Sequence, residues 1–289
     1  MGRTKAKEVD EESSEKKEEN TAKGITALEA FVYEILRPSN YITSEPLELH
    51  YWNETYYLHD YYPHRKWKSI KEEYASLSEW IYNCKKRYDE QYYFELIWAI
   101  MHVCANIPEK TIYLFNVPSS EKPFMKPNGT PINETPITEI IGMLDETRFG
   151  RSLGDLMYKR YLHYKTCCFL KRTFCPDKKF IACPHYIERT ESLVPNHERP
   201  KQRMKKATFE EQLNSMAFNK ENEPFEQLDA VNIKECFSKD MEDSAALIID
   251  DIMTSGASIN AAYTIVEQAK IERNLNFTSI LKLTMARTV

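Results

Sequence analysis

The stretch ALIIDDIMTSGAS, residues 246–258, gives the clearest indication of how this chain folds. An apolar run at 245–249 has the length of a strand that is buried on both faces. Residues 277–285 alternate as a second strand does, and the intervening residues 258–271 have apolar side chains at helical spacing, namely Ile259, Ala262, Val266 and Ala269. Strand, helix and strand in this order predict a βαβ unit and therefore a parallel sheet.

Two adjacent carboxylates, Asp250 and Asp251, stand where we expect the first of these strands to end. Ligands of open α/β sheets bind at the carboxyl ends of the strands, and the start of the next helix offers unpaired N–H groups to a phosphate. The turn between strand and helix adds three hydroxyls, and its glycine lets the backbone approach a ligand closely. The candidate phosphate loop consists of Thr254, Ser255, Gly256, Ala257 and Ser258.

The two carboxylates suit ribose hydroxyls or a Mg²⁺ ion better than they suit the phosphate itself. An alternative is that Asp250 and Asp251 only cap the helix and that the hydroxyls make a turn. Dinucleotide-binding and Walker-type loops are excluded, because both need several glycines close together. The chain has seven glycines, at positions 2, 24, 129, 142, 150, 154 and 256, and Gly256 stands alone.

The order of residues 247–258 resembles the signature with which type I phosphoribosyltransferases bind phosphoribosyl pyrophosphate (PRPP). In that signature apolar residues precede two acidic residues, two apolar residues and Thr-Thr-Gly-x-Thr, and here Ser255 and Ser258 replace threonines but keep the hydroxyl. Residues 280–288 look like the closing strand of ComF-like homologues of these enzymes. The likeness covers about residues 178–289 and implies an α/β fold with the parallel sheet of a phosphoribosyltransferase.

The resemblance implies a glycosyltransferase of nucleotide metabolism, in which pyrophosphate leaves C1 of PRPP and a base nitrogen attacks. Asp250 and Asp251 would carry the catalysis, facing the 2′ and 3′ hydroxyls of the ribose, with Mg²⁺ held by them directly or through water. Residues 254–258 would hold the 5′-phosphate of PRPP or of a nucleotide.

Two further loops of the family would precede this motif. A short strand expected at 180–183 is followed by His185 and Arg189, which stand in the place of the pyrophosphate loop. The place of the mobile catalytic loop is taken by a basic run that consists of Arg199, Lys201, Arg203, Lys205 and Lys206. Such a run suits pyrophosphate or a nucleic-acid backbone, or it is simply a solvated face.

The rest of the chain divides into three parts by composition. Residues 1–23 are mostly charged, and we expect a disordered tail. Helical patterns over 24–107 and the proline-rich linker expected at 108–136 predict a mainly helical N-terminal region at 24–120. Helical spacing resumes at 137–144, so that a phosphoribosyltransferase-like α/β domain is expected over 121–289.

Aromatic side chains gather between residues 51 and 98, which include all four tryptophans. They suit a helical core, or alternatively the stacking of unpaired bases. A second function is therefore open, in which the chain is a non-catalytic sensor of PRPP or nucleotides and binds a protein or nucleic acid through residues 24–107. ComF-like proteins are linked to DNA uptake, and the chain loosely resembles effectors of retron-type anti-phage systems. Self-association is a further alternative.

The composition points to a cytoplasmic protein without a membrane partner. The net charge is −5, and the N-terminus lacks the apolar segment of a secretory signal. The longest apolar segment, residues 96–107, falls short of the ~20 residues that span a membrane. We expect the seven cysteines to be reduced thiols, mostly buried, rather than zinc ligands.

Overall fold

The computed structural model describes residues 47–84, 89–119, 135–145, 167–184, 186–191, 193, 207–218, 243–272, 275 and 277–289. They form a six-stranded sheet in the order β1-β2-β8-β7-β3-β4 and a two-stranded sheet of β5 and β6. In the large sheet every pair is parallel except β1 with β2, so the fold is α/β with a mixed sheet. The strands are β1 (His50–Trp52), β2 (Thr55–Tyr61), β3 (Thr111–Asn116), β4 (Lys179–Cys183), β5 (Ile187–Arg189), β6 (Met216–Phe218), β7 (Ser244–Met253) and β8 (Phe277–Thr288).

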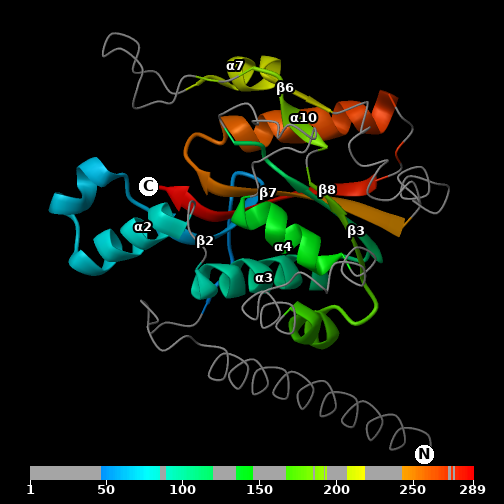
Figure 1. The fold of residues 1–289 in the computed structure, drawn as a ribbon, viewed down its shortest axis with the longest axis horizontal. Coiled ribbons are helices and arrows are strands. Elements are labelled where there is room, and N and C mark those ends of the chain that lie inside the picture. The colour runs from blue at the N-terminus through cyan, green and yellow to red at the C-terminus, as the bar shows by residue number, and fades with distance from the viewer. Residues whose placement is uncertain are drawn as a thin grey trace, which may run out of the picture. The chain divides into compact units, whose positions relative to one another are not determined.

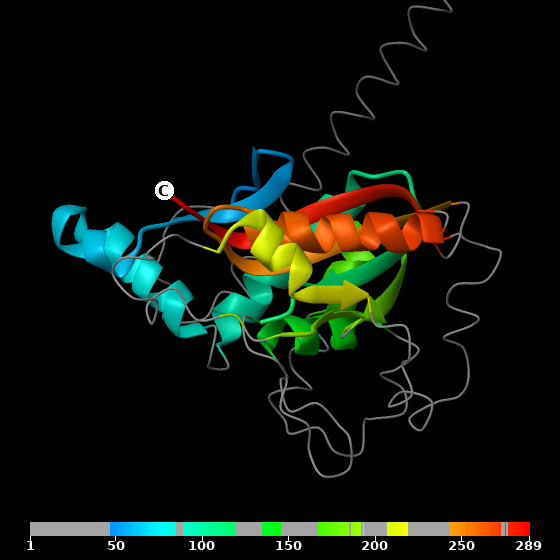
Figure 2. The same cartoon turned by 90° about the horizontal axis from the view of Figure 1, so that it is seen from above.

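Helices cover both faces of the large sheet. Figure 1 shows α10 on one face and α3 and α4 on the other, and α7 and β6 lie against α10 (Figure 2). The helices are the 3-10 helix η1 (His64–Ser69), α2 (Glu72–Cys84), α3 (Glu90–Ala105), α4 (Pro136–Leu144), α7 (Phe209–Asn214) and α10 (Ala257–Glu272), and residues 167–174 are also helical. No helix in the described ranges has the length and apolar character that crossing a bilayer requires.

The predicted βαβ unit is confirmed as β7, α10 and β8. β7 and β8 are parallel, and Leu247 lies beside Leu281. The predicted apolar face of α10 is buried, including Ile259 and Val266. The expected strand at 180–183 is confirmed as β4, which lies next to β3 at the edge of the sheet.

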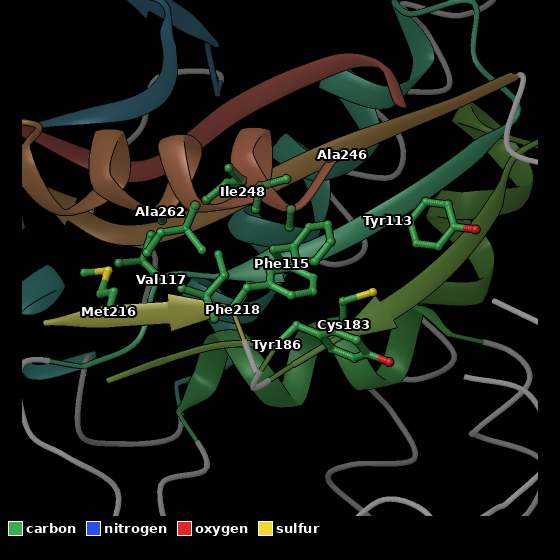
Figure 3. Packing of buried hydrophobic residues seen from close by; sticks show 14 of the residues in the cluster. Tyr113, Phe115, Val117, Cys183, Tyr186, Met216, Phe218, Ala246, Ile248 and Ala262 are labelled. Carbon is green, nitrogen blue, oxygen red and sulfur yellow. The ribbon is translucent and has the colours of Figure 1, made fainter. Parts of the chain in front are cut away.

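A large apolar cluster packs between α10 and the sheet. Phe115 of β3 lies within it, close to Ile248 of β7, to Phe218 of the small sheet and to Tyr186, which precedes β5 (Figure 3). The neighbouring residues of β3, at 112 and 114, are equally buried, and alternation along the strand turns them to the α3 and α4 side. Burial on both faces explains why the central strands read as continuous apolar runs.

The expectation of a loop or linker throughout 108–136 is wrong, because this stretch contains β3, an interior strand of the large sheet. Its sequence, TIYLFN, is rich in β-branched and aromatic residues, but the flanking prolines at 108 and 118 concealed it. The expected boundary near residue 120 stays a prediction; β3 precedes it and pairs with β4 and β7, which follow it.

The N-terminal region is less uniformly helical than its pattern predicts. α2 and α3 lie where helices were expected, and α3 is buried on nearly every side. The hairpin of β1 and β2 was not predicted, and β2 joins the large sheet beside β8. The charged tail at 1–23 and the remaining helical pattern before residue 47 lie outside the described residues.

Candidate functional site

The carboxylate pair lies within β7 rather than at its end. β7 pairs with β3 as far as Ile249, but its pairing with β8 continues to Met253. The predicted strand end at Ile249 is therefore too early. The strand continues because Ile252 and Met253 are buried, although two half-buried carboxylates precede them.

Each aspartate holds a backbone N–H group of the next residue. Asp250 Oδ1 accepts from the N–H of Asp251 at 2.9 Å, and Asp251 Oδ1 accepts from the N–H of Ile252 at 2.5 Å. Both bonds lie within β7 and fix the two side chains locally, so they do not test the alternative in which the aspartates cap α10. A carboxylate has about four acceptor positions, so one such bond is compatible with a further donor from a ligand.

The charges of Asp250 and Asp251 affect the pKa values of two ionisable side chains, Arg189 and Tyr92. Burial lowers the pKa of Arg189 in β5 to about 10, and the charge of Asp250 acts in the opposite direction. Burial raises the pKa of Tyr92 in α3 well above its usual range, and the charge of Asp251 adds to that shift. At neutral pH the pair therefore lies near a buried cation and a neutral phenol.

Arg189 connects the end of β3 to α7. Its Nε donates to the carbonyl of Ser119 at 3.1 Å and its Nη2 to that of Pro118 at 3.4 Å. Its Nη1 donates to Gln212 Oε1 at 2.9 Å and to Ser215 Oγ at 2.5 Å. Arg189 is therefore close enough to Asp250 to feel its charge, and its guanidinium is hydrogen-bonded to protein groups. Its place in a pyrophosphate loop stays a prediction.

The candidate phosphate loop joins β7 to α10 in the order that the sequence predicts. Thr254 and Ser255 are exposed, while Ala257 and Ser258 are partly exposed in the first turn of the helix. The Ser255 hydroxyl accepts from the N–H of Ala257 at 3.4 Å. Hydroxyls and helix N–H groups therefore meet at one end of a 16-residue helix.

Gly256 has the backbone that only glycine adopts easily. It is buried, and its φ is +77°, in the left-handed region. Its carbonyl accepts from the N–H of Asn260 at 2.9 Å and so begins the hydrogen bonding of α10. A Cβ at this position would lie 3.2 Å from Asn260 Nδ2 and 3.7 Å from Met253 Sδ.

The loop lies at the edge of the sheet that α/β proteins use for ligands. The chain passes from β3 to β4 on one side, and from β7 to β8 on the other side. The direction of the connections therefore reverses between β3 and β7. Since β3 and β7 are parallel, the residues that follow them leave the sheet at the same carboxyl end of the strands. Just beyond β3, the N–H of Val117 still donates to the carbonyl of Ile249 at 2.9 Å. Ligands bind at such switch points.

Several predicted site residues lie outside the described residues. They are His185 and the basic run of Arg199, Lys201, Arg203, Lys205 and Lys206. Their roles stay predictions. The cysteines at 84, 104, 167, 168, 175 and 183 are free thiols, all of them buried except Cys168, which is partly exposed.

Sequence reasoning missed three polar side chains near the site. Tyr92 lies in a helix that reads as core, and Asn260 in the polar first turn of α10. Lys282 occupies the middle of the buried strand β8. Of the three, only Lys282 carried a signal, because a lysine within an apolar strand requires a partner.

Comparison of the chain with models of protein families and with curated proteins gives no match.

Proposed function

We propose that the chain binds a ribose 5-phosphate group, as PRPP or as a nucleotide, and transfers ribose phosphate to a nitrogen acceptor. The observation that supports this most is the conformation of the candidate phosphate loop. Gly256 is left-handed at the start of α10, exposed hydroxyls precede it, and a carboxylate pair precedes them. This is the order of the phosphoribosyltransferase motif, at the sheet edge where α/β proteins bind ligands.

The 5′-phosphate would lie on the loop at the start of α10. The first N–H groups of a helix have no partner within the helix, and the helix end carries a partial positive charge of about half a unit. The hydroxyls of Thr254, Ser255 and Ser258 would add donors. Such a site needs no lysine in the loop itself, and residues 254–258 contain none.

Asp250 and Asp251 would accept hydrogen bonds from the 2′ and 3′ hydroxyls of the ribose. In the transfer, the bond from C1 to the pyrophosphate oxygen breaks, and its electron pair leaves with pyrophosphate. The lone pair of the acceptor nitrogen forms the new C1–N bond, and the acceptor loses a proton. Positive charge that develops on the ribose is stabilised by the two carboxylates.

The carboxylate pair fits Mg²⁺ only together with a ligand. In the part of the chain that the structure describes, no group of three His, Cys, Asp or Glu side chains could hold a metal. Mg²⁺ usually binds one or two carboxylates and completes its coordination with substrate phosphates and water, which Asp250 and Asp251 would allow. Bound there, it would offset negative charge on the leaving pyrophosphate.

Removal of Mg²⁺ with EDTA is therefore expected to weaken PRPP binding by about tenfold, and ribose 5-phosphate binding by no more than about twofold. The difference arises because only PRPP carries the pyrophosphate that completes the coordination of the metal. Isothermal titration of both ligands, with and without Mg²⁺, measures it. An equal loss for the two ligands would contradict a metal shared between Asp250, Asp251 and pyrophosphate.

The alternative function is a sensor or effector that binds the same ligand without turnover. It is favoured by the exposed aromatic side chains of β1, since Tyr51 is 62% exposed and Trp52 is 46% exposed. Such rings can stack on unpaired bases, which suits the nucleic-acid-linked systems that the sequence suggested.

Pyrophosphate release from PRPP, measured over a panel of bases and nucleotides, tests the proposal and separates the two functions. Turnover supports the transferase. PRPP binding without turnover, with nucleic acid retained at low salt, supports the effector. A protein that binds neither PRPP nor nucleotides overturns both.

A further inference from the structure

Lys282 is a buried cation in the middle of β8. It lies beside Ile248 of β7, and its side chain is only 6% exposed. A buried ammonium group is costly unless it is paired and hydrogen-bonded. The partners of Lys282 therefore indicate what its charge does.

These partners leave the positive charge incompletely offset. Lys282 Nζ donates to Asn260 Oδ1 at 2.9 Å and lies 5.2 Å from the centre of the Tyr263 ring. Its one carboxylate partner among the described residues is Glu54, at 3.5 Å and 82% exposed. A carboxylate so well solvated screens the buried charge only weakly.

Asn260 connects Lys282 to the candidate phosphate loop. Its backbone N–H bonds the carbonyl of Gly256 at 2.9 Å. Its Nδ2 lies 3.2 Å from the point where a Cβ of Gly256 would stand. The side-chain amide of Asn260 therefore lies between the ammonium group and the glycine of the loop.

We propose that Lys282 is a positioning residue of the phosphate loop, which holds Asn260 against Gly256 and places a positive charge behind the bound 5′-phosphate. This inference rests on the proposed function. Lys282 would then add a positive charge from β8, through the first turn of α10, to the N–H groups and hydroxyls of residues 254–258, which have no basic side chain of their own.

The negative charge of Glu54 should act on phosphate binding in the opposite sense to the positive charge of Lys282. Asn53 and Glu54 both have positive φ, +48° and +59°, in the two-residue turn between β1 and β2. This turn sets the Glu54 carboxylate beside Lys282, where it reduces the field at the loop. Loss of the Glu54 charge should therefore strengthen phosphate binding, although it removes a partner of the lysine.

The test is isothermal titration of PRPP with Mg²⁺ into the full chain and three variants. Lys282→Met should weaken binding about tenfold, as expected for one unit charge at several ångströms in a partly solvated site. Glu54→Gln should strengthen it about two- to threefold, which loss of structure alone would not do. Lys270→Met is the matched control, since it removes a charge that lies on α10 about 20 Å from the start of the helix, and it should change nothing.

The inference is overturned if Lys282→Met binds PRPP within twofold of wild type, or if Glu54→Gln binds it more weakly. Should Lys282→Met fail to fold, the exposed Glu54 decides alone. Failure of the wild type to bind PRPP or nucleotides removes the proposed function and this inference with it. Binding by the wild type, with unchanged variants, removes this inference only.

Discussion

Replacing Gly256 with alanine is expected to weaken PRPP binding by about 100-fold, that is, by about 2.7 kcal/mol. An alanine at φ +77° is strained by roughly 1–2 kcal/mol, and its Cβ would press on Asn260 Nδ2 at 3.2 Å. The loop can relieve this strain only by moving, and the amides that would face the phosphate then move with it. Isothermal titration measures the loss.

Gly142→Ala is the matched control. Gly142 lies in α4, and a Cβ there would meet nothing within 4 Å. Alanine is the better helix former, so this variant should be more stable by up to about 1 kcal/mol and should bind PRPP as the wild type does. Equal losses at 142 and 256 would contradict the role given to Gly256.

The double change Asp250→Asn and Asp251→Asn is expected to lower turnover of PRPP about 1000-fold, the size of effect that loss of transition-state charge stabilisation produces. The amide oxygens can still accept the backbone N–H groups of Asp251 and Ile252, so the fold should survive. Only the two negative charges are lost. Pyrophosphate release under saturating PRPP and Mg²⁺ measures the change.

The two single variants give the control for this pair. If the ribose contacts both carboxylates, each single change lowers turnover and the double change lowers it most. Removal of the Asp251 charge should also lower the pKa of Tyr92, although burial, the main cause of its rise, still holds that pKa above its usual range. Wild-type turnover by the double variant would exclude these residues from the chemistry.

The sequence predicted the βαβ unit because its signal is local. The apolar run of β7 and the helical spacing of α10 each lie in one short segment, and so does the alternation of β8. β3 was not predicted because prolines flank it, and β2 was not predicted because the segments around it have helical patterns. Both became strands because the sheet offers them partners, which a linear pattern does not contain.

The candidate site also has a part that the sequence predicted and a part that it did not. Asp250, Asp251 and the loop at 254–258 are contiguous, so their order could be read directly. Tyr92 and Arg189 come from distant elements, and only the packing of α3 and β5 around the sheet brings them near enough to feel the charges of the carboxylate pair. Lys282 of β8 contacts Asn260 of α10, which bonds Gly256 of the loop, and no spacing along the chain predicts this connection.

A crystal structure of the protein with PRPP and Mg²⁺ tests the central claim most directly. We predict the 5′-phosphate on the N–H groups and hydroxyls of residues 254–258, with the ribose hydroxyls facing Asp250 and Asp251. Density for PRPP at another place, or a loop at 254–258 that stays empty at saturating PRPP, would contradict the account.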